Sequence, residues 1–117
     1  MVDLNKPIYN LLKGIAKTQL EFPSLSASFP IITFAEISNI SEYEVENEER
    51  ISDITYQIDV WDNGKNRAEC EEIALKVSAV LTGAGFTRVL GRGLKDPSGL
   101  IRKTMYFKTK AINEKER

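Results

Sequence analysis

Few of the residue types that carry out catalysis are present in this sequence of 117 residues. It contains no histidine, so the commonest general base, the commonest metal ligand and every Ser-His or Cys-His nucleophile pair are excluded. The single cysteine, Cys70, cannot form an intramolecular disulfide and cannot complete a structural zinc site without histidine partners. An acid–base pair would have to come from Asp, Glu, Lys and Tyr alone. We therefore expect that the protein is not an enzyme and has no cofactor.

The densest group of carboxylates lies between residues 42 and 49. It consists of Glu42, Glu44, Glu46, Glu48 and Glu49. The segment lacks the Asp/Asn-Gly spacing of an EF-hand loop, so a solvated acidic surface is favoured over a metal site. Glutamates at alternate positions fit a strand with one acidic face, whereas repulsion between like charges fits a loop. The sequence leaves both structures open and predicts no metal site.

Two short segments of the chain are rich in glycine, residues 83–85 and 91–93. Neither precedes a helix in a strand–loop–helix unit, so neither is interpreted as a phosphate-binding loop. Residues 83–85 are better explained as the end of a helix, with Gly83 in the left-handed cap position. Residues 91–93 are better explained as part of a connecting loop.

Hydrophobic patterning predicts the elements that position these residues. Helical spacing predicts a helix over about 5–17, capped by Asn5, and a second that begins after Asn66 and ends before Gly83. Short β-branched or alternating runs predict strands over 31–37, 51–61, 86–90 and 100–111. Residues 18–30 and 91–99 are expected to form loops, and 112–117 a charged tail.

The strand at 51–61 indicates the fold class. Along it, apolar and polar side chains alternate strictly: Ile54, Tyr56, Ile58 and Val60 face one way, and Asp53, Thr55, Gln57 and Asp59 the other. Such a strand has one buried face and one face in water. Together with the order of the elements, this predicts a single α+β domain over 1–117, with its core over about 5–111. We expect a mostly antiparallel sheet of about four strands, with both helices packed on one face.

Charge is unevenly distributed along the chain although the formal net charge is only -1. Residues 40–72 contain 11 acidic and three basic side chains, whereas residues 86–117 contain nine basic and three acidic ones. Two interpretations stay open: ordinary solvated surface, or two patches that attract each other between copies of the chain. No segment approaches the roughly 18 apolar residues of a membrane span, and no signal-peptide pattern is present, so we expect a cytoplasmic protein without a membrane partner.

Several segments together resemble a known family. They are the helix PIYNLLKGI, the strand FPIITF, the strand YQIDVWDNG, the helix NRAECEEIALKVSAVL and the segment LKDPSGLIRKTMYFKTKA. In this order they resemble the tail terminator, or tail completion, proteins of long-tailed bacteriophages and prophages. The resemblance covers about residues 5–111.

The resemblance implies a structural α+β subunit that forms a hexameric ring, or stays monomeric until it meets the growing tail. The ring caps the tail tube, stops its polymerisation and provides the surface for joining to the head. The implied partners are other copies of the chain, the tail tube protein and a head-completion or neck protein, with DNA only as passing cargo. The implied location is the virion tail, after assembly in the cytoplasm of the host bacterium.

Two groups of residues are candidates for such a role. The candidate interface consists of Trp61, Arg88, Arg92, Lys95 and Asp96. The five glutamates of residues 42–49 are candidates for lining the channel of the ring, where negative charge would keep passing DNA from binding. Two alternatives remain: another phage head–tail neck or head-completion protein, and a ferredoxin-like regulatory module that binds a metabolite.

Overall fold

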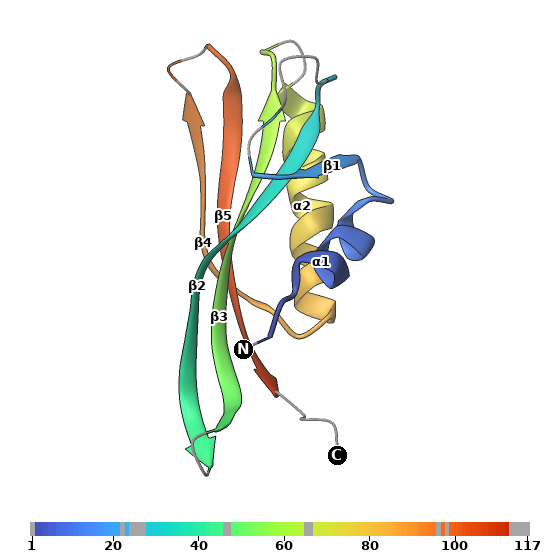
Figure 1. Cartoon of the computed structure of the whole chain (residues 1–117). Helices are drawn as coiled ribbons and strands as arrows, with labels where there is room; N and C mark the ends of the chain where they lie inside the picture. The colour runs from blue at the N-terminus through green and yellow to red at the C-terminus, as the bar shows by residue number, and fades with distance from the viewer. Residues whose placement is uncertain are drawn as a thin grey trace.

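The computed structural model describes residues 2–21, 23, 28–45, 48–64, 67–95, 97 and 99–112; for residues 42–45, 48–50 and 95 it describes the backbone only. Figure 1 shows two helices beside a long, twisted sheet. In chain order the elements are α1 (Asn5–Leu12), β1 (Lys17–Leu20), β2 (Ile31–Val45), β3 (Glu48–Asp62), α2 (Arg67–Gly83), β4 (Thr87–Lys95) and β5 (Ile101–Ile112). The molecule is elongated, with extents of 53 × 26 × 24 Å.

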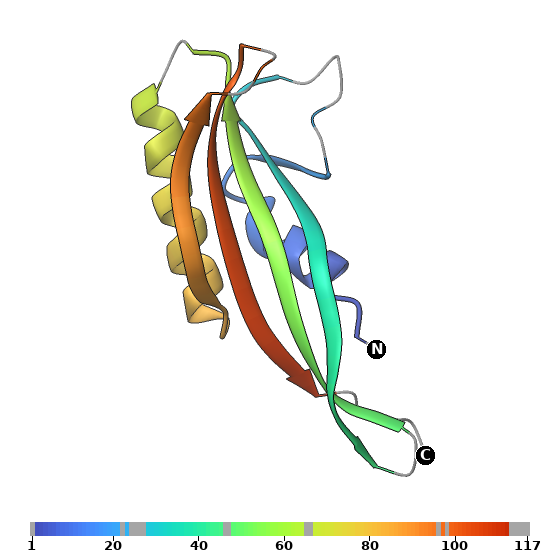
Figure 2. The ribbon, with the colours of Figure 1, turned by 90° about the vertical axis from the view of Figure 1, so that its left-hand side faces the viewer.

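The five strands form one sheet in the order β1-β2-β3-β5-β4. β1 pairs with β2 in parallel, and every other pair is antiparallel. Both helices lie on the same side of the sheet, α2 beside β4 and α1 behind β2 and β3 (Figure 2). The predicted α+β class and mostly antiparallel sheet are confirmed. The predicted number of strands is wrong, because the sheet has five strands rather than four.

The additional strand is β1, which lies where the sequence predicted the end of a helix and a loop. α1 ends at Leu12, well before the predicted end at 17, and Lys17–Leu20 pair with Ile31–Phe34 of β2. Gly14 weakens helical continuation, and hydrogen bonds to β2 then outweigh the local helical propensity. Nor does Asn5 cap α1: the N-cap is Leu4 and makes no side-chain cap hydrogen bond. The Asn5 side chain instead accepts a hydrogen bond of 2.6 Å from the Tyr56 hydroxyl.

All four predicted strands extend beyond their predicted bounds, and β3, predicted over 51–61, covers Glu48–Asp62. β2 continues through 38–45, so the strand interpretation of this segment is correct and the loop interpretation is wrong. β4 continues to Lys95, so residues 91–95 belong to an edge strand rather than to a loop. β5 reaches Ile112, the first residue of the predicted tail, and 113–117 lie outside the described residues. In a sheet, the backbone N–H and C=O groups of a strand form hydrogen bonds with the adjacent strand. Because these bonds do not depend on the side-chain pattern, the strands continue beyond the residues that the pattern predicts.

The core lies between the sheet and the two helices. α2 contributes Cys70, Ile73, Ala74, Val77 and Leu81, which pack against the apolar face of β3 and β5. α2 ends in a Schellman motif, with the amide of Phe86 donating to the carbonyl of Leu81 at 2.9 Å. The left-handed residue of this motif is Gly85, with φ of 101°, and not Gly83 as predicted. The predicted cap residue of α2, Asn66, lies outside the described residues.

Candidate functional site

The face of the sheet away from the helices carries a polar network centred on Asp59 of β3. Thr104 of β5 donates to Asp59 Oδ1 at 2.6 Å, and Gln57 donates to Asp59 Oδ2 at 2.9 Å. The Arg102 guanidinium lies 3.7 Å from Asp59 Oδ2. Asp59 is only 6% exposed and Thr104 only 3%, so this part of the predicted water-exposed face is shielded by neighbouring side chains. A carboxylate buried to this degree requires such partners.

Trp61, a candidate interface residue, lies on the same face as Asp59 and is 3% exposed. Its indole N–H donates to Thr33 Oγ1 at 2.7 Å, and the Arg102 guanidinium carbon lies 5.2 Å from the ring centroid. Both contacts are within the subunit and link β2, β3 and β5. Because Trp61 is buried, a partner that docks on this face would contact Arg102 rather than the indole ring.

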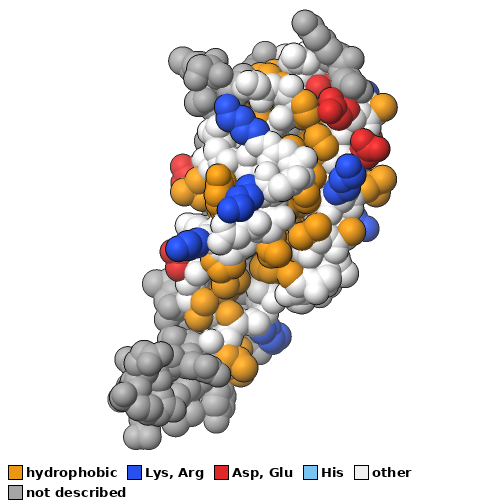
Figure 3. Space-filling model, turned by 90° about the vertical axis from the view of Figure 1, so that its right-hand side faces the viewer, with side chains coloured by type: hydrophobic (Ala, Val, Ile, Leu, Met, Phe, Trp, Pro, Cys, Tyr) orange, Lys and Arg blue, Asp and Glu red, His pale blue; other side chains and the backbone are white. Residues whose placement is uncertain are grey.

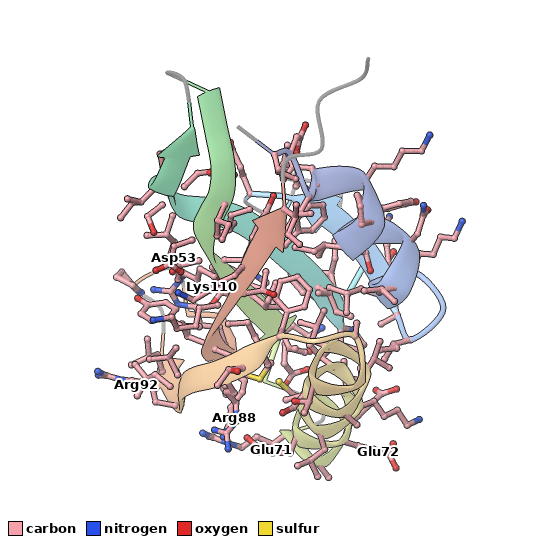
Figure 4. All side chains as sticks on the ribbon, turned by 90° about the horizontal axis from the view of Figure 1, so that it is seen from below. Asp53, Glu71, Glu72, Arg88, Arg92 and Lys110 are labelled. Atoms are coloured by element: carbon pink, nitrogen blue, oxygen red, sulfur yellow. The ribbon has the colours of Figure 1, made fainter. Side chains whose placement is uncertain are left out.

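The other candidate interface residues gather on or next to β4, the edge strand farthest from β1. Arg88 and Arg92 are exposed on this strand, and Figure 4 shows both at the β4 edge, with Glu71 and Glu72 of α2 on the helix side. Lys95 is the last residue of β4 and only its backbone is described, whereas Asp96 lies outside the described residues. The sheet separates this group from Trp61, because β5 lies between β3 and β4.

The candidate channel residues lie at the far end of the β2–β3 hairpin, which extends beyond the other strands in Figure 2. Glu42 and Glu44 belong to the last part of β2, and Glu48 and Glu49 to the first part of β3, with Glu44 paired to Glu49. Glu46 lies outside the described residues. Four of the five glutamates therefore belong to the two strands of one projecting hairpin, at the opposite end of β2 from the strand β1.

A hollow with a volume of about 430 Å³ lies between α1, the end of α2 and β5. Leu4, Pro7, Leu11, Ala84 and Phe86 contribute most of its lining. Figure 3 shows this helix side, with a broken band of hydrophobic side chains between Lys and Arg side chains on the left and acidic ones at the upper right. The polar groups in this lining are Asn10, Thr109 and Lys110, so the hollow offers few of the convergent polar groups that the metabolite-binding alternative requires. Among the described residues, no cluster of acidic, Cys or His side chains could hold a metal ion.

Burial raises the pKa values of two side chains in the core on the helix side, Tyr56 and Cys70. Burial, together with the charges of Glu36 and Asp3, raises the pKa of Tyr56 to about 12. Burial likewise raises the pKa of Cys70 to about 11, with added contributions from Asp62 and Glu71. The Cys70 thiol lies 3.5 Å from the Val60 carbonyl oxygen, to which it donates. A thiol with so high a pKa has almost no thiolate at neutral pH, which supports the interpretation of Cys70 as a core residue.

The sequence did not predict that Thr104 completes the hydrogen-bond network of Asp59, nor did it predict the positions of the strand bulges. Alternation placed Asp59 and Gln57 on one face, but Thr104, which is distant in sequence, joins them only through the β3–β5 register. Bulges occur between Glu36 and Ser38 and between Arg88 and Leu90. They depend on pairing between strands, so no local residue pattern indicates them.

Comparison with known protein families identifies the family to which the chain belongs. The family model for the tail completion protein gp17 matches residues 8–106. The chain belongs to this family of phage tail completion proteins. No curated protein matches the chain. As a member of the family, the protein is a structural component of the virion tail and interacts with other tail or head proteins. In the described part of the chain, no helix is both long and apolar enough to cross a membrane.

Proposed function

We propose that the protein caps the end of the phage tail tube as a hexameric ring, stops tail polymerisation and provides the surface to which the head is joined. The observation that carries this proposal is the match of the family model over residues 8–106. An elongated subunit with an edge strand at each side of its sheet supports it. Unpaired strand edges are suited to contacts with identical neighbours, since each edge offers a row of backbone donors and acceptors.

The test is to mix the purified protein with purified tubes of the cognate tail tube protein and to examine them by electron microscopy. We expect a six-fold cap at one end of each tube and no further elongation when free tube protein is added. Tubes that bind no protein and continue to elongate would overturn the proposal. Binding to the portal complex instead of to the tube end would identify the protein as a neck or head-completion component.

The candidate interface residues supply a sharper version of the test. Arg92 and Lys95 belong to the exposed β4 edge, so replacing both with glutamate should reverse its charge and weaken cap formation several-fold. Lys108→Glu is the matched control, because Lys108 is also exposed but lies on β5. Equal capping by the Arg92→Glu/Lys95→Glu protein and the control would remove the β4 edge from the assembly surface.

The acidic hairpin leads to a separate proposal, that its glutamates line the channel of the ring. Negative charge along a channel repels the phosphates of passing DNA and prevents it from binding to the wall. Replacing Glu42, Glu44, Glu46, Glu48 and Glu49 with glutamine should leave caps intact by microscopy and slow DNA ejection. Unchanged ejection from particles with normal caps would contradict this role.

A further inference from the structure

The exposed apolar side chains are concentrated at two opposite edges of the molecule. Eight large apolar side chains are exposed in the described part of the chain. At the β1–β2 edge lie Leu20, Ile37 and Ile40; at the β4 edge, on β4 and the adjacent α2, lie Leu75, Val89 and Leu90. Apolar side chains gathered at strand edges favour association, and edges without protection are a risk for aggregation.

A β-bulge presents the central residue of each patch. In β2 the register shifts between Glu36 and Ser38, so Ile37 is the additional residue, and it is 49% exposed. In β4 the shift lies between Arg88 and Leu90, so Val89 is the additional residue, and it is 56% exposed. Neither residue has a pairing partner in the adjacent strand. Each patch therefore has an exposed apolar side chain at an irregularity of its strand.

The register places these two bulges at nearly the same height along the strands. One row of paired residues crosses the four strands β4, β5, β3 and β2: Arg88, Phe107, Tyr56 and Glu36. Val89 and Ile37 each follow the outer residue of this row, on strands that run in opposite directions. They are therefore offset by only about two residues, roughly 7 Å.

Charge at the two edges is complementary in both layers of the molecule. In the sheet layer, β4 exposes Arg88 and Arg92, whereas the β1–β2 edge exposes Glu21 and Glu36 together with Lys17. In the helix layer the signs are reversed. α2, beside β4, exposes Glu69, Glu71 and Glu72 together with Arg67 and Lys76; the α1 side exposes Lys6 and Lys13 together with Asp3. Figure 4 shows the order at the β4 edge, from Arg92 through Arg88 to Glu71 and Glu72.

The β4 edge also contains a groove that suits an apolar side chain. It has a volume of about 150 Å³ and lies between α2 and β4. Ala74, Leu75 and Met105 form apolar parts of its wall, and Gly91 and Arg88 form the β4 side. The β1–β2 edge offers the exposed Ile37, and its own hollow, of about 280 Å³, differs in lining: Glu21, Thr33, Phe34, Ala35, Gln57 and Asp59. The two edges therefore differ in shape as well as in charge.

We propose that the β4 edge of one copy docks against the β1–β2 edge of the next copy, with Val89 and the α2–β4 groove facing Ile37. This inference rests on the proposed ring and identifies the two surfaces that build it. Because the patches differ and lie on opposite edges, the contact is heterologous and leaves a free edge of each kind for further copies. Because their heights nearly match, successive copies are related mainly by rotation, which allows the chain of copies to close rather than to form a spiral.

The strand directions agree with this arrangement. β4 runs opposite to β2, as the successive antiparallel pairs β2–β3, β3–β5 and β5–β4 require. A rotation about an axis parallel to the strands preserves these directions. β4 of one copy therefore meets β2 of the next in antiparallel orientation, the more stable orientation for strands in contact.

Cysteine cross-linking tests the contact directly. Ile37→Cys and Val89→Cys are made as separate proteins, mixed in equal amounts with tail tubes, and treated with a short bismaleimide. Both sites are exposed, so the fold should be preserved. Cys70, which is 2% exposed, stays unreactive and can remain in place. We expect covalent dimers in the mixture, monomers when either protein is used alone, and a ladder of products from the Ile37→Cys/Val89→Cys protein.

The controls separate failure of this contact from failure of the proposed function. Lys108→Cys, exposed on β5 rather than at an edge, should give no dimers with either partner. Dimers from one edge variant alone would overturn the heterologous contact in favour of a two-fold one. Normal caps without cross-links would overturn the contact but keep the function. If the wild-type protein forms no caps, the proposed function fails, and with it the inference.

Discussion

Both faces of the central sheet contain buried side chains, but these are shielded from water by different means. On the helix side, Ile54, Ile58 and Phe107 are fully buried beneath the two helices. On the opposite side, Asp59 and Thr104 are almost as inaccessible without a helix above them. The first face gains stability from apolar area removed from water, and the second depends on pairing of polar groups. The comparison indicates that the helix side determines stability, whereas the open side mainly fixes the geometry of β2, β3 and β5.

The largest expected difference is between two adjacent residues of β3. Ile58 is fully buried against the helices, whereas its neighbour Gln57 is half-buried on the open face. Ile58→Ala should lower the free energy of unfolding by about 2–5 kcal/mol, because it removes apolar contacts and leaves a cavity. Gln57→Ala should lower it by only about 1 kcal/mol, through loss of its hydrogen bond to Asp59. Urea unfolding followed by tryptophan fluorescence measures both free energies. Similar losses for the two variants would contradict the claim that the helix side contributes more to stability than the open face.

Alternation within β3 was enough to predict the helix-side face, because a strand repeats every two residues and the apolar residues follow that repeat. The second face could be predicted only as polar. Its network joins Gln57 and Asp59 to Thr104, and no local signal indicates which distant residue a carboxylate will meet. β1 was missed for the same reason, since four residues without a clear alternating pattern become a strand only when β2 is alongside. For the projecting hairpin, the sequence showed the acidic residues but did not decide between a strand and a loop.

High pH should destabilise the helix-side face specifically. The pKa of Cys70 is raised from 9.0 to about 11, and that of Tyr56 from 10.0 to about 12. Each group stays protonated in the folded state over a pH range where the unfolded chain releases its proton. Stability is therefore complete below about pH 9 and falls as the pH rises toward 12, by at most about 2–3 kcal/mol per group.

Unfolding measured at a series of pH values from 8 to 12 checks this dependence. Cys70→Ala should remove the part that begins near pH 9, and Tyr56→Phe the part that begins near pH 10. A profile that is flat up to pH 12 in the wild-type protein would show that the helix side stays accessible to hydroxide.

Removing the charge at the centre of the open face should have a smaller effect. Asp59→Asn keeps the shape but weakens the hydrogen bond from Thr104 and the ion pair with Arg102. We expect a loss of about 1–2 kcal/mol in the free energy of unfolding, since hydrogen bonds to charged groups are the stronger ones. Glu72→Gln removes an exposed charge on α2 and serves as the control, with a change below about 0.5 kcal/mol. A loss as large as that of Ile58→Ala would mean that the open face contributes equally to stability.

The smallest expected effect lies at the rim of the helix side, where Lys103 of β5 meets Glu71 of α2 at 3.3 Å. Both side chains are partly in water, so attraction is screened and the pair should contribute no more than about 1 kcal/mol. A double-mutant cycle with Glu71→Gln and Lys103→Met isolates the coupling, and 1 M salt should reduce it further. A coupling above about 2 kcal/mol that persists in salt would show that charge pairing also stabilises the helix side. The two faces would then differ in the amount of apolar burial and no longer in the kind of interaction that holds them.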